Sequence, residues 1–464
     1  MALAPSRKAE PRTGRHTPLP LFAEPLSSLS SPGIPQSAPR PQDARERLRT
    51  LLAGELNFHG EDSGYASHDV HAFAAKFPPQ LPRTFIQALT APGDLVLDPM
   101  MGSGTTVVEA LLAGRRGVGL DLDPLAIRVS QVKTTSLDTD HLRRTGQQVL
   151  IRAQALVATP GLTPPCDAQT QAFIDYWFLP QTQRDLVALA MAIHEVSEVT
   201  TRRFLELTLS SIIITKSGGV SRARDLAHSR PHLDLTKVPK NALEQFTLRL
   251  EKNLRSLAHL PRRETLIAPL AGDARTIPLR AEVVDLIVTS PPYANAIDYM
   301  RAHKFSLVWL GASVSHLAQL RAAYLGAERD KSLPDRVLPE RPATMIRSLA
   351  ACDRGKARAL RQYFLEMTSV CAEMYRVLRP GAAAIVVVGP SVLRGLNVQT
   401  HQCLADIADT CGFDVVGVVQ RVLDRNKRMM PARFGKKTDA MIEQRMHEEY
   451  VLGLLKPVAA LSGD

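Results

Sequence analysis

The segment Ser290-Pro291-Pro292-Tyr293 offers the chain's most suggestive combination of acceptors and an aromatic ring. The apolar run 283–288 before it predicts a buried strand. Two successive prolines end sheet pairing and leave the carbonyls of Ser290 and Pro291 as unpaired acceptors. Together with the Ser290 hydroxyl and the Tyr293 ring, they could bind a planar group that carries an exocyclic amine, such as a nucleobase. On its own, a motif of this kind would be read as a simple proline turn. The interpretation therefore depends on the other motifs in the chain.

A second segment, residues 94–106, reads as a short strand, a glycine-containing turn and the start of a helix. Gly102 and Gly104 allow a positive φ and a close backbone approach to a ligand. A helix over 105–113 would present its first N–H groups to a carboxylate. Val107 replaces the third glycine of the dinucleotide fingerprint, and no Walker loop is present, so this turn alone identifies no ligand.

A third segment, Gly117 to Asp121, predicts another strand that ends in an acid. The acid follows the glycine turn by about 20 residues, the spacing at which a carboxylate reaches ribose hydroxyls in a doubly wound sheet. The order of strand, turn, helix and acidic strand therefore predicts a nucleoside-binding α/β core.

Together the three segments resemble the motifs of S-adenosylmethionine-dependent DNA amino-methyltransferases, closest to the N4-cytosine-specific modification methylases. Residues 98–106 (DPMMGSGTT) resemble the cofactor loop of that family, 119–124 (GLDLDP) its ribose-binding turn, and 290–293 (SPPY) its catalytic motif. Residues 73–81 and 272–274 resemble two further cofactor segments, and 295–304 a segment found in a subset of these enzymes. The resemblance extends from about residue 68 to the C-terminus.

The resemblance implies S-adenosylmethionine as cofactor and assigns residues to it. Asp121 would bind the ribose hydroxyls and Asp273 the adenine amine. The methionine end would lie against the remaining assigned residues, which are Lys76, Asp98, Pro99, Gly102, Ser103, Gly104 and Thr105. No metal is implied.

The resemblance also implies a mechanism for the catalytic residues Ser290, Pro291, Pro292 and Tyr293. An aromatic amine is a poor nucleophile because its lone pair is delocalised into the ring. Hydrogen bonds to the Ser290 hydroxyl and the Pro291 carbonyl would localise that lone pair, while Tyr293 stacks on a base flipped out of the duplex. The sulfonium methyl is already activated, so positioning should supply most of the rate.

The first residue of the motif bears on which amine is methylated. Serine there is more typical of N4-cytosine enzymes, whereas N6-adenine enzymes more often begin with Asp or Asn. We therefore expect methylation of cytosine N4 in duplex DNA, with adenine N6 as the alternative, followed by RNA or a catalytically silent DNA-binding protein. Intact Gly102, Gly104, Asp121, Ser290 and Tyr293 argue against the silent protein. The role would be that of a restriction-modification or solitary modification enzyme, and the sequence leaves open a cognate restriction endonuclease.

Composition agrees with this expectation. The chain has 464 residues and a formal net charge of +11, which suits a polyanionic partner. No apolar run approaches the length of a membrane span, and the N-terminus shows no signal-peptide core, so we expect a cytoplasmic protein. The five cysteines form no C-x-x-C pair and no zinc-ligand spacing.

The alternation of strands and helices predicts an α/β fold, a doubly wound, seven-stranded Rossmann-like methyltransferase sheet whose last strand is antiparallel. We expect a disordered basic tail over 1–45 and two halves of the catalytic core over 46–139 and 263–464. Between them, 140–262 predicts a helical insertion for target recognition, with helices such as 184–199 and 243–257. After it, Arg379-Pro380-Gly381 is expected to turn a helix over 356–378 into a strand over 383–388. Basic residues in flexible or motif-flanking segments are candidates for DNA contact, namely Lys216, Arg222, Arg224, Arg230, Arg301, His303 and Arg428.

Overall fold

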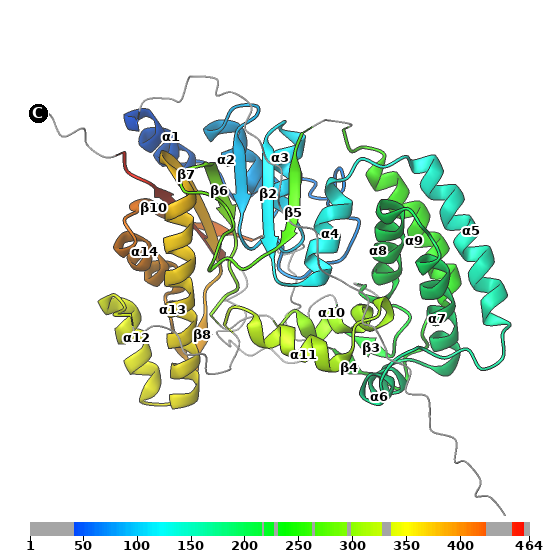
Figure 1. The fold of residues 1–464 in the computed structure, drawn as a ribbon. Helices are drawn as coiled ribbons and strands as arrows, with labels where there is room; N and C mark the ends of the chain where they lie inside the picture. Colours follow the sequence, from blue (N-terminus) through cyan, green and yellow to red (C-terminus); the bar gives the residue numbers. More distant parts are fainter. Residues whose placement is uncertain are drawn as a thin grey trace, which may run out of the picture. The chain divides into compact units, whose positions relative to one another are not determined.

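A computed structural model describes residues 41–215, 218–226, 231–261, 265–294, 298–326, 336–423 and 448–458. One seven-stranded sheet runs through this part of the chain, in the order β10-β11-β7-β6-β1-β2-β5 (Figure 1). Its strands are β1 (Leu95–Asp98), β2 (Arg116–Asp121), β5 (Ile267–Ala271), β6 (Val284–Thr289), β7 (Leu378–Val388), β10 (Asp414–Val422) and β11 (Glu448–Leu455). All neighbours pair in parallel except β11, which is antiparallel to both β7 and β10. The predicted mixed sheet with an antiparallel last strand is confirmed.

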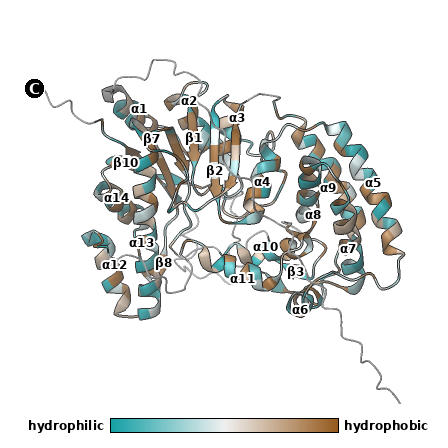
Figure 2. Cartoon of the chain, in the orientation of Figure 1, coloured by the Kyte–Doolittle hydropathy of each residue, from teal (hydrophilic) through white to brown (hydrophobic). Residues whose placement is uncertain are grey.

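Helices cover both faces of the sheet, because side chains alternate between the faces along each strand. Val96 and Leu286 pack on one face with α1 (Pro41–Ala53) and α2 (Gln80–Leu89). Their neighbours Leu97 and Ile287 pack on the other face with α13 (Arg354–Val377) and α14 (Thr400–Thr410). The central strands are consequently rich in apolar residues, as expected for strands buried on both faces (Figure 2).

The chain between β1 and β7 forms further helices, among them α3 (Thr105–Leu112), α4 (Pro124–Thr134), α10 (Met300–Leu307), α11 (Val314–Ala323) and α12 (Glu340–Ala350). Of these, α3 follows the glycine turn and α12 packs against α13 and α14. Among the described residues, no helix is both long and apolar enough to span a membrane.

Between β2 and β5 the chain is largely helical, with α5 (Thr139–Val157), α6 (Ala168–Trp177), α7 (Pro180–His194), α8 (Val199–Ile213) and α9 (Ala242–Leu257). Two two-residue strands, β3 (Ala223–Arg224) and β4 (His232–Leu233), pair beside them. The apolar core of these helices continues into α4 through Val129 and into α10 through Phe305. The helical region therefore shares its apolar core with α4 and α10.

Three local expectations were wrong. The single helix expected over 184–199 is two, because α7 ends at His194 and α8 begins at Val199. Arg379-Pro380-Gly381, expected as a turn, belongs to β7, where a register shift opposite 284–286 accommodates a proline that cannot donate to the sheet. Helix α1 begins at Pro41, inside the expected tail, and residues 1–40 lie outside the described range.

Candidate active site

A cavity of about 610 Å³ opens where β1, β2, β5 and β6 end. Parallel strands bring their carboxyl ends to one edge of a sheet, and ligands of doubly wound folds bind at that edge. The cavity is lined by parts of the segments 73–77, 99–105, 121–126, 272–274, 290–294, 298–301, 318–326 and 356–360. Segments predicted to hold the cofactor and the catalytic motif thus line one cavity.

The glycine turn after β1 has the backbone that its sequence predicts. Gly102 and Gly104 have φ of +47° and +73°. A Cβ at Gly104 would lie 2.5 Å from the Ser130 hydroxyl, and one at Gly102 would lie 3.3 Å from the Phe73 ring. Larger residues would therefore push α3 and its turn out of place. Pro99, Gly102, Ser103 and Thr105 line the cavity, so the start of α3 faces a ligand there.

Asp121, at the end of β2, links the glycine turn to the turn 119–124 through hydrogen bonds. One carboxylate oxygen accepts from the Gly102 N–H at 2.9 Å and the other from the Asp123 N–H at 2.8 Å. The side chain also lines the cavity, and each oxygen keeps a second lone pair for a ligand hydroxyl. Burial, followed by the nearby Asp123 carboxylate, raises the pKa of Asp121 to about 7.

His303 and Asp123 form a buried pair. The His303 Nδ1 lies 2.6 Å from an Asp123 oxygen, and the His303 side chain is only 2% exposed. Although burial opposes it, the pairing with His303 lowers the pKa of Asp123. Asp123 also caps α4 by accepting from the Leu125 N–H. The prediction that His303 contacts DNA does not fit this burial, and its place indicates a support for the turn 119–124.

Asp98 and Gly104 lie behind the cavity lining, although they were expected to contact the cofactor. Asp98 is buried and accepts a hydrogen bond from the Thr289 hydroxyl at 2.7 Å, which links the ends of β1 and β6. Burial raises the pKa of Asp98 to about 6, despite hydrogen bonds to its carboxylate. Its position indicates that it holds the glycine turn beside the catalytic motif.

Asp273 lines the cavity, and its carboxylate forms a bidentate ion pair with Arg275. The Arg275 Nε and Nη2 atoms lie 2.9 and 2.6 Å from the two Asp273 oxygens. The same guanidinium donates to Glu366 of α13 at 2.9 Å. The sequence analysis did not identify Arg275 or Glu366 as partners of this site. The only hint in the sequence was that Arg275 follows Asp273 by two residues.

The catalytic motif is only partly turned toward the cavity. Ser290 and Pro292 line it, whereas Tyr293 lies outside the lining. The Tyr293 ring packs against Gly389, where a Cβ would lie 2.5 Å from the ring. Its hydroxyl donates to Glu449 of β11 at 3.2 Å. The expected stacking of Tyr293 on a base stays a prediction.

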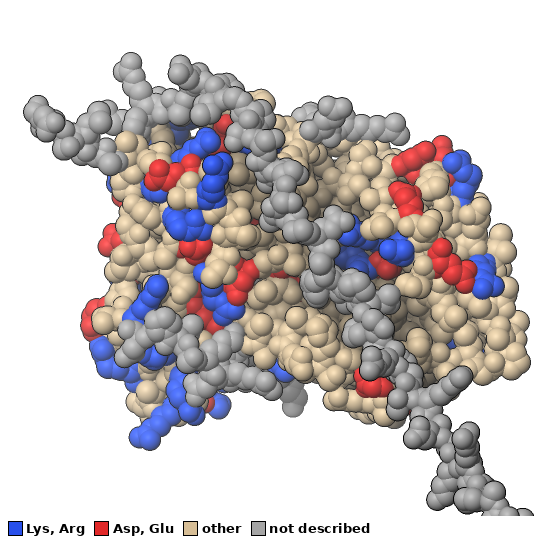
Figure 3. All heavy atoms as spheres, viewed as in Figure 1, with Lys and Arg blue, Asp and Glu red and all other residues tan. Residues whose placement is uncertain are grey.

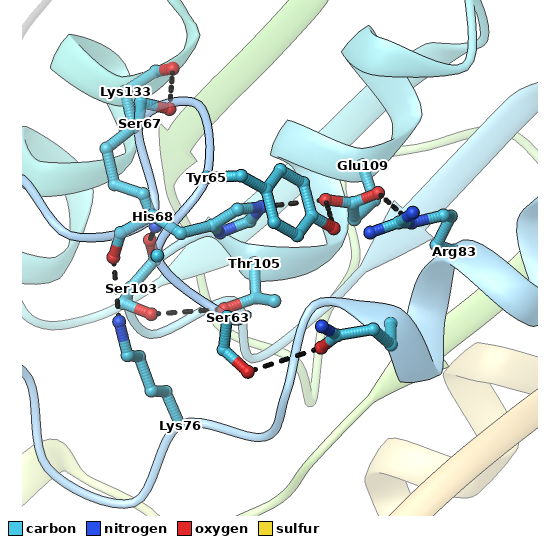
Figure 4. A network of polar contacts seen from close by, with 12 residues as sticks. Ser63, Tyr65, Ser67, His68, Lys76, Arg83, Ser103, Thr105, Glu109 and Lys133 are labelled. Carbon is cyan, nitrogen blue, oxygen red and sulfur yellow. Dashed lines mark hydrogen bonds and ion pairs between the residues drawn. The ribbon is translucent and has the colours of Figure 1, made fainter. Parts of the chain in front are cut away.

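A buried polar network, which the sequence did not reveal, supports the segment before the glycine turn (Figure 4). Glu109 of α3 is 1% exposed and accepts from the Tyr65 hydroxyl and His68 Nε2, both at 2.7 Å. Burial raises the pKa of Glu109 to about 7. Lys133, also 1% exposed, donates to the Ser103 carbonyl at 2.6 Å.

Lys76 belongs to the same network. Its ammonium donates to the His68 carbonyl at 2.7 Å, and its side chain lines the cavity (Figure 4). Lys76 thus joins the network to the wall of the site.

The candidate DNA-contact residues occupy different surroundings. Arg222 donates to the Asp175 carbonyl at 2.8 Å, near the end of α6, and Arg224 pairs with Asp234. Arg301 lines the cavity and pairs with Asp298 at 3.0 Å while 60% exposed. The other candidates, Lys216, Arg230 and Arg428, lie outside the described residues.

Comparisons with known proteins find similarity to DNA methyltransferases. A family model for N6/N4 DNA methylases matches residues 51–132, which contain the glycine turn and Asp121. The chain is 23% identical over 397 residues to the type II methyltransferase M.MvaI of Kocuria varians, covering 79% of this chain and 87% of that one. It is 21% identical over 377 residues to M.BsoBI of Geobacillus stearothermophilus, covering 70% and 74% of the two chains.

Solved structures are more distant. A TehB-like S-adenosylmethionine-dependent methyltransferase from Corynebacterium glutamicum is 10% identical, with a TM-score of 0.27, and covers 90% of this chain and 97% of that one. One from Methanosarcina mazei is 11% identical, with a TM-score of 0.29, and covers 81% and 97%. Scores this low add nothing to the fold described above.

Proposed function

Because the chain belongs to the S-adenosylmethionine-dependent DNA amino-methyltransferases, we propose that it methylates the N4 amine of cytosine in duplex DNA. The observation that carries this proposal is the shared cavity, which Asp121 and the glycine turn line together with Ser290. A methyl donor held by the turn would therefore lie in the same space as the hydroxyl that binds the acceptor amine.

The residues of the cavity fit S-adenosylmethionine. Lys76 and the N–H groups at the start of α3 suit the methionine carboxylate, and Asp121 suits the ribose hydroxyls. Asp273 suits the adenine amine, and Met101 and Leu325 add apolar surface to the same cavity. Gly102 lines the cavity and has no side chain, so a cofactor can approach its backbone closely.

When bound, the cofactor supplies an activated methyl group on a sulfonium. The chain's own residues would orient the acceptor amine: the Ser290 hydroxyl and the carbonyl of Pro291 accept its hydrogen bonds and so favour a tetrahedral nitrogen with a localised lone pair. Ser290 follows Thr289, whose hydroxyl donates a hydrogen bond to the buried Asp98. This bond holds the backbone in place directly before Ser290. The proton can leave to water after transfer.

Cytosine is proposed over adenine because serine stands first in the motif. Adenine N6 is the second candidate, since both amines require the same local geometry. The two long matches, M.MvaI and M.BsoBI, are type II methyltransferases, which supports a role in a restriction-modification system. A cognate restriction endonuclease is then the proposed partner.

The activity can be tested by transfer of label from tritiated S-adenosylmethionine to mixed-sequence duplex DNA. We expect label in the DNA with the wild-type protein and much less with Ser290→Ala. A protein that binds S-adenosylmethionine but labels no duplex would contradict the proposal, and label in RNA alone would change the substrate.

A further inference from the structure

Tyr299 borders the cavity, and its hydroxyl has no hydrogen-bond partner among the described residues. The residue lies directly before α10, and its carbonyl accepts from the N–H groups of Ala302 and His303, both at 3.0 Å. Tyr293, in the catalytic motif, lies outside the cavity lining and donates its hydroxyl to Glu449. Of these two tyrosines, Tyr299 is therefore the one that a ligand in the cavity meets.

The ring of Tyr299 is held by two aromatic neighbours. It stacks on Phe73, with ring centroids 5.5 Å apart and planes inclined by 29°. The His303 ring packs beside both, with centroids 5.1 Å from Phe73 and 5.9 Å from Tyr299. His303 is itself fixed by its hydrogen bond to Asp123, so the three rings hold one another in place. We call Phe73, Tyr299 and His303 the aromatic cluster.

The aromatic cluster contacts both segments that we assign to the cofactor. Phe73 lies against the glycine turn, since a Cβ at Gly102 would be 3.3 Å from its ring. His303 is bound to Asp123, in the turn 119–124. Phe73 and Tyr299 also line the cavity. Two aromatic rings therefore belong to the same part of the cavity wall as the glycine turn and the turn 119–124.

The surroundings of Tyr299 favour a cation. Burial, followed by the carboxylates of Asp121 and Asp123, raises the pKa of the Tyr299 hydroxyl, so the phenol stays neutral. A neutral aromatic ring is negative on its face and attracts a cation there. Over most of the molecular face in Figure 3, acidic and basic side chains are interspersed, so their charges largely offset one another. The wall at Tyr299, by contrast, combines two nearby carboxylates with aromatic rings, a setting that suits a cation.

S-adenosylmethionine carries two cations, the sulfonium and the α-ammonium of its methionine part. The sulfonium has no hydrogen to donate, so a protein recognises it by charge and shape. Aromatic rings provide such recognition, as they do for quaternary ammonium groups. The α-ammonium has three N–H donors, as a lysine ammonium has, and polar acceptors satisfy these better than a ring does. The aromatic cluster therefore suits the sulfonium.

We propose that Tyr299, supported by Phe73 and His303, binds the sulfonium of S-adenosylmethionine through the face of its ring. This inference rests on the proposed function only for the identity of the cofactor. Methyl transfer breaks the bond between sulfur and the methyl carbon and leaves its electron pair on sulfur, so the product is the neutral thioether S-adenosylhomocysteine. The ring then loses the charge that it attracts, and the contact favours the cofactor over the spent product.

The affinities of the charged cofactor and its neutral product provide the test. Calorimetry would measure Kd for S-adenosylmethionine and for S-adenosylhomocysteine, with the wild-type protein and with Tyr299→Leu. The ratio of the two constants isolates the charge, because loss of ring area affects both ligands alike. The preference for S-adenosylmethionine should fall by about 5- to 30-fold in Tyr299→Leu and stay unchanged in Tyr299→Phe, which keeps the ring.

A matched control removes a tyrosine elsewhere. Tyr176, on α6, is 53% exposed, and Tyr176→Leu should leave both affinities unchanged. If Tyr299→Leu fails to fold, pentafluorophenylalanine in place of Tyr299 gives the same readout. Fluorine withdraws electron density from the face of the ring and nearly keeps its shape, so the preference for S-adenosylmethionine should fall relative to Tyr299→Phe.

The outcomes separate the inference from the proposed function. Equal weakening of both ligands in Tyr299→Leu would mean that Tyr299 contacts another part of the cofactor or only supports the wall, and would overturn the inference. Unchanged binding of both ligands with slower methyl transfer to mixed-sequence duplex DNA would assign Tyr299 to the target base and overturn it as well. A wild-type protein that binds neither ligand would contradict the cofactor and, with it, the proposed function.

Discussion

The two walls of the cavity are held in different ways. On the cofactor wall (residues 73–77, 99–105 and 121–126), buried charged groups have close partners, as Asp121 has in Gly102 and Asp123 in His303. On the wall that we propose for the substrate (residues 290–294, 298–301 and 318–326), Arg301 and Arg321 are more than half exposed and both pair with Asp298. Buried charges are costly unless they are paired, whereas exposed charges are screened by salt. We therefore expect the cofactor wall to be preorganised for its ligand, and the exposed cations of the substrate wall to attract a polyanion.

The largest effect should come from Ser290, the substrate-wall residue closest to the chemistry. Ser290→Ala removes an acceptor for the amine, so kcat should fall by about 100-fold or more. S-adenosylmethionine affinity should be unaffected, because the change lies on the other wall. Single-turnover methyl transfer and calorimetry measure the two effects. Ser315→Ala, an exposed change on α11, is the control. Full turnover by Ser290→Ala would refute the catalytic assignment.

The next effect concerns the stability of the cofactor wall. Glu109→Leu would leave the half-buried Tyr65 and the buried His68 without their shared acceptor. The free energy of unfolding should fall by about 3 kcal/mol, as measured by urea denaturation. Glu195→Gln, which breaks an exposed pair with Arg152, should cause no measurable change. A loss below about 1 kcal/mol for Glu109→Leu would mean that the network does not hold this wall.

A smaller effect should follow from Asp121→Ala. Loss of hydrogen bonds to a charged acceptor should weaken S-adenosylmethionine binding by about 10- to 100-fold. Turnover at saturating cofactor should change much less, provided that the two walls act separately. Asp140→Asn, an exposed change on α5, serves as the control. A variant that bound the cofactor normally but turned over slowly would reverse the roles of the walls.

The smallest effect is a pH dependence. Asp121 has a raised pKa of about 7, and its ionised form is the better acceptor for ribose hydroxyls. Cofactor binding should favour the ionised carboxylate, so affinity should rise by about tenfold between about pH 6 and pH 8. Asp121→Asn should remove this contribution to the pH profile. An identical profile in the variant would assign the pH dependence to another group.

The sequence predicted the parts of the site that depend on neighbouring residues. The glycine turn, Asp121 and the segment 290–293 were recognisable because strand, turn and functional residue follow one another directly. The pairing of Asp123 with His303, 180 residues apart, was not recognisable, since it depends on how α10 packs. The Glu109 network was missed for the same reason.

The errors in the helices and strands have related causes. Apolar periodicity continues across the break between α7 and α8, so the pattern alone could not end the first helix at His194. Pro380 and Gly381 usually mark a turn, yet pairing within the sheet extends β7 through them. Tertiary packing determined both outcomes.

Identification of the methylated nucleoside tests the central claim most directly. Duplex DNA treated with the purified protein and S-adenosylmethionine would be digested to nucleosides and analysed by mass spectrometry. The account predicts N4-methylcytosine, absent from DNA treated with Ser290→Ala. N6-methyladenine would contradict the assignment of cytosine while keeping the cavity and its two walls, and the absence of any methylated nucleoside would contradict the proposed activity.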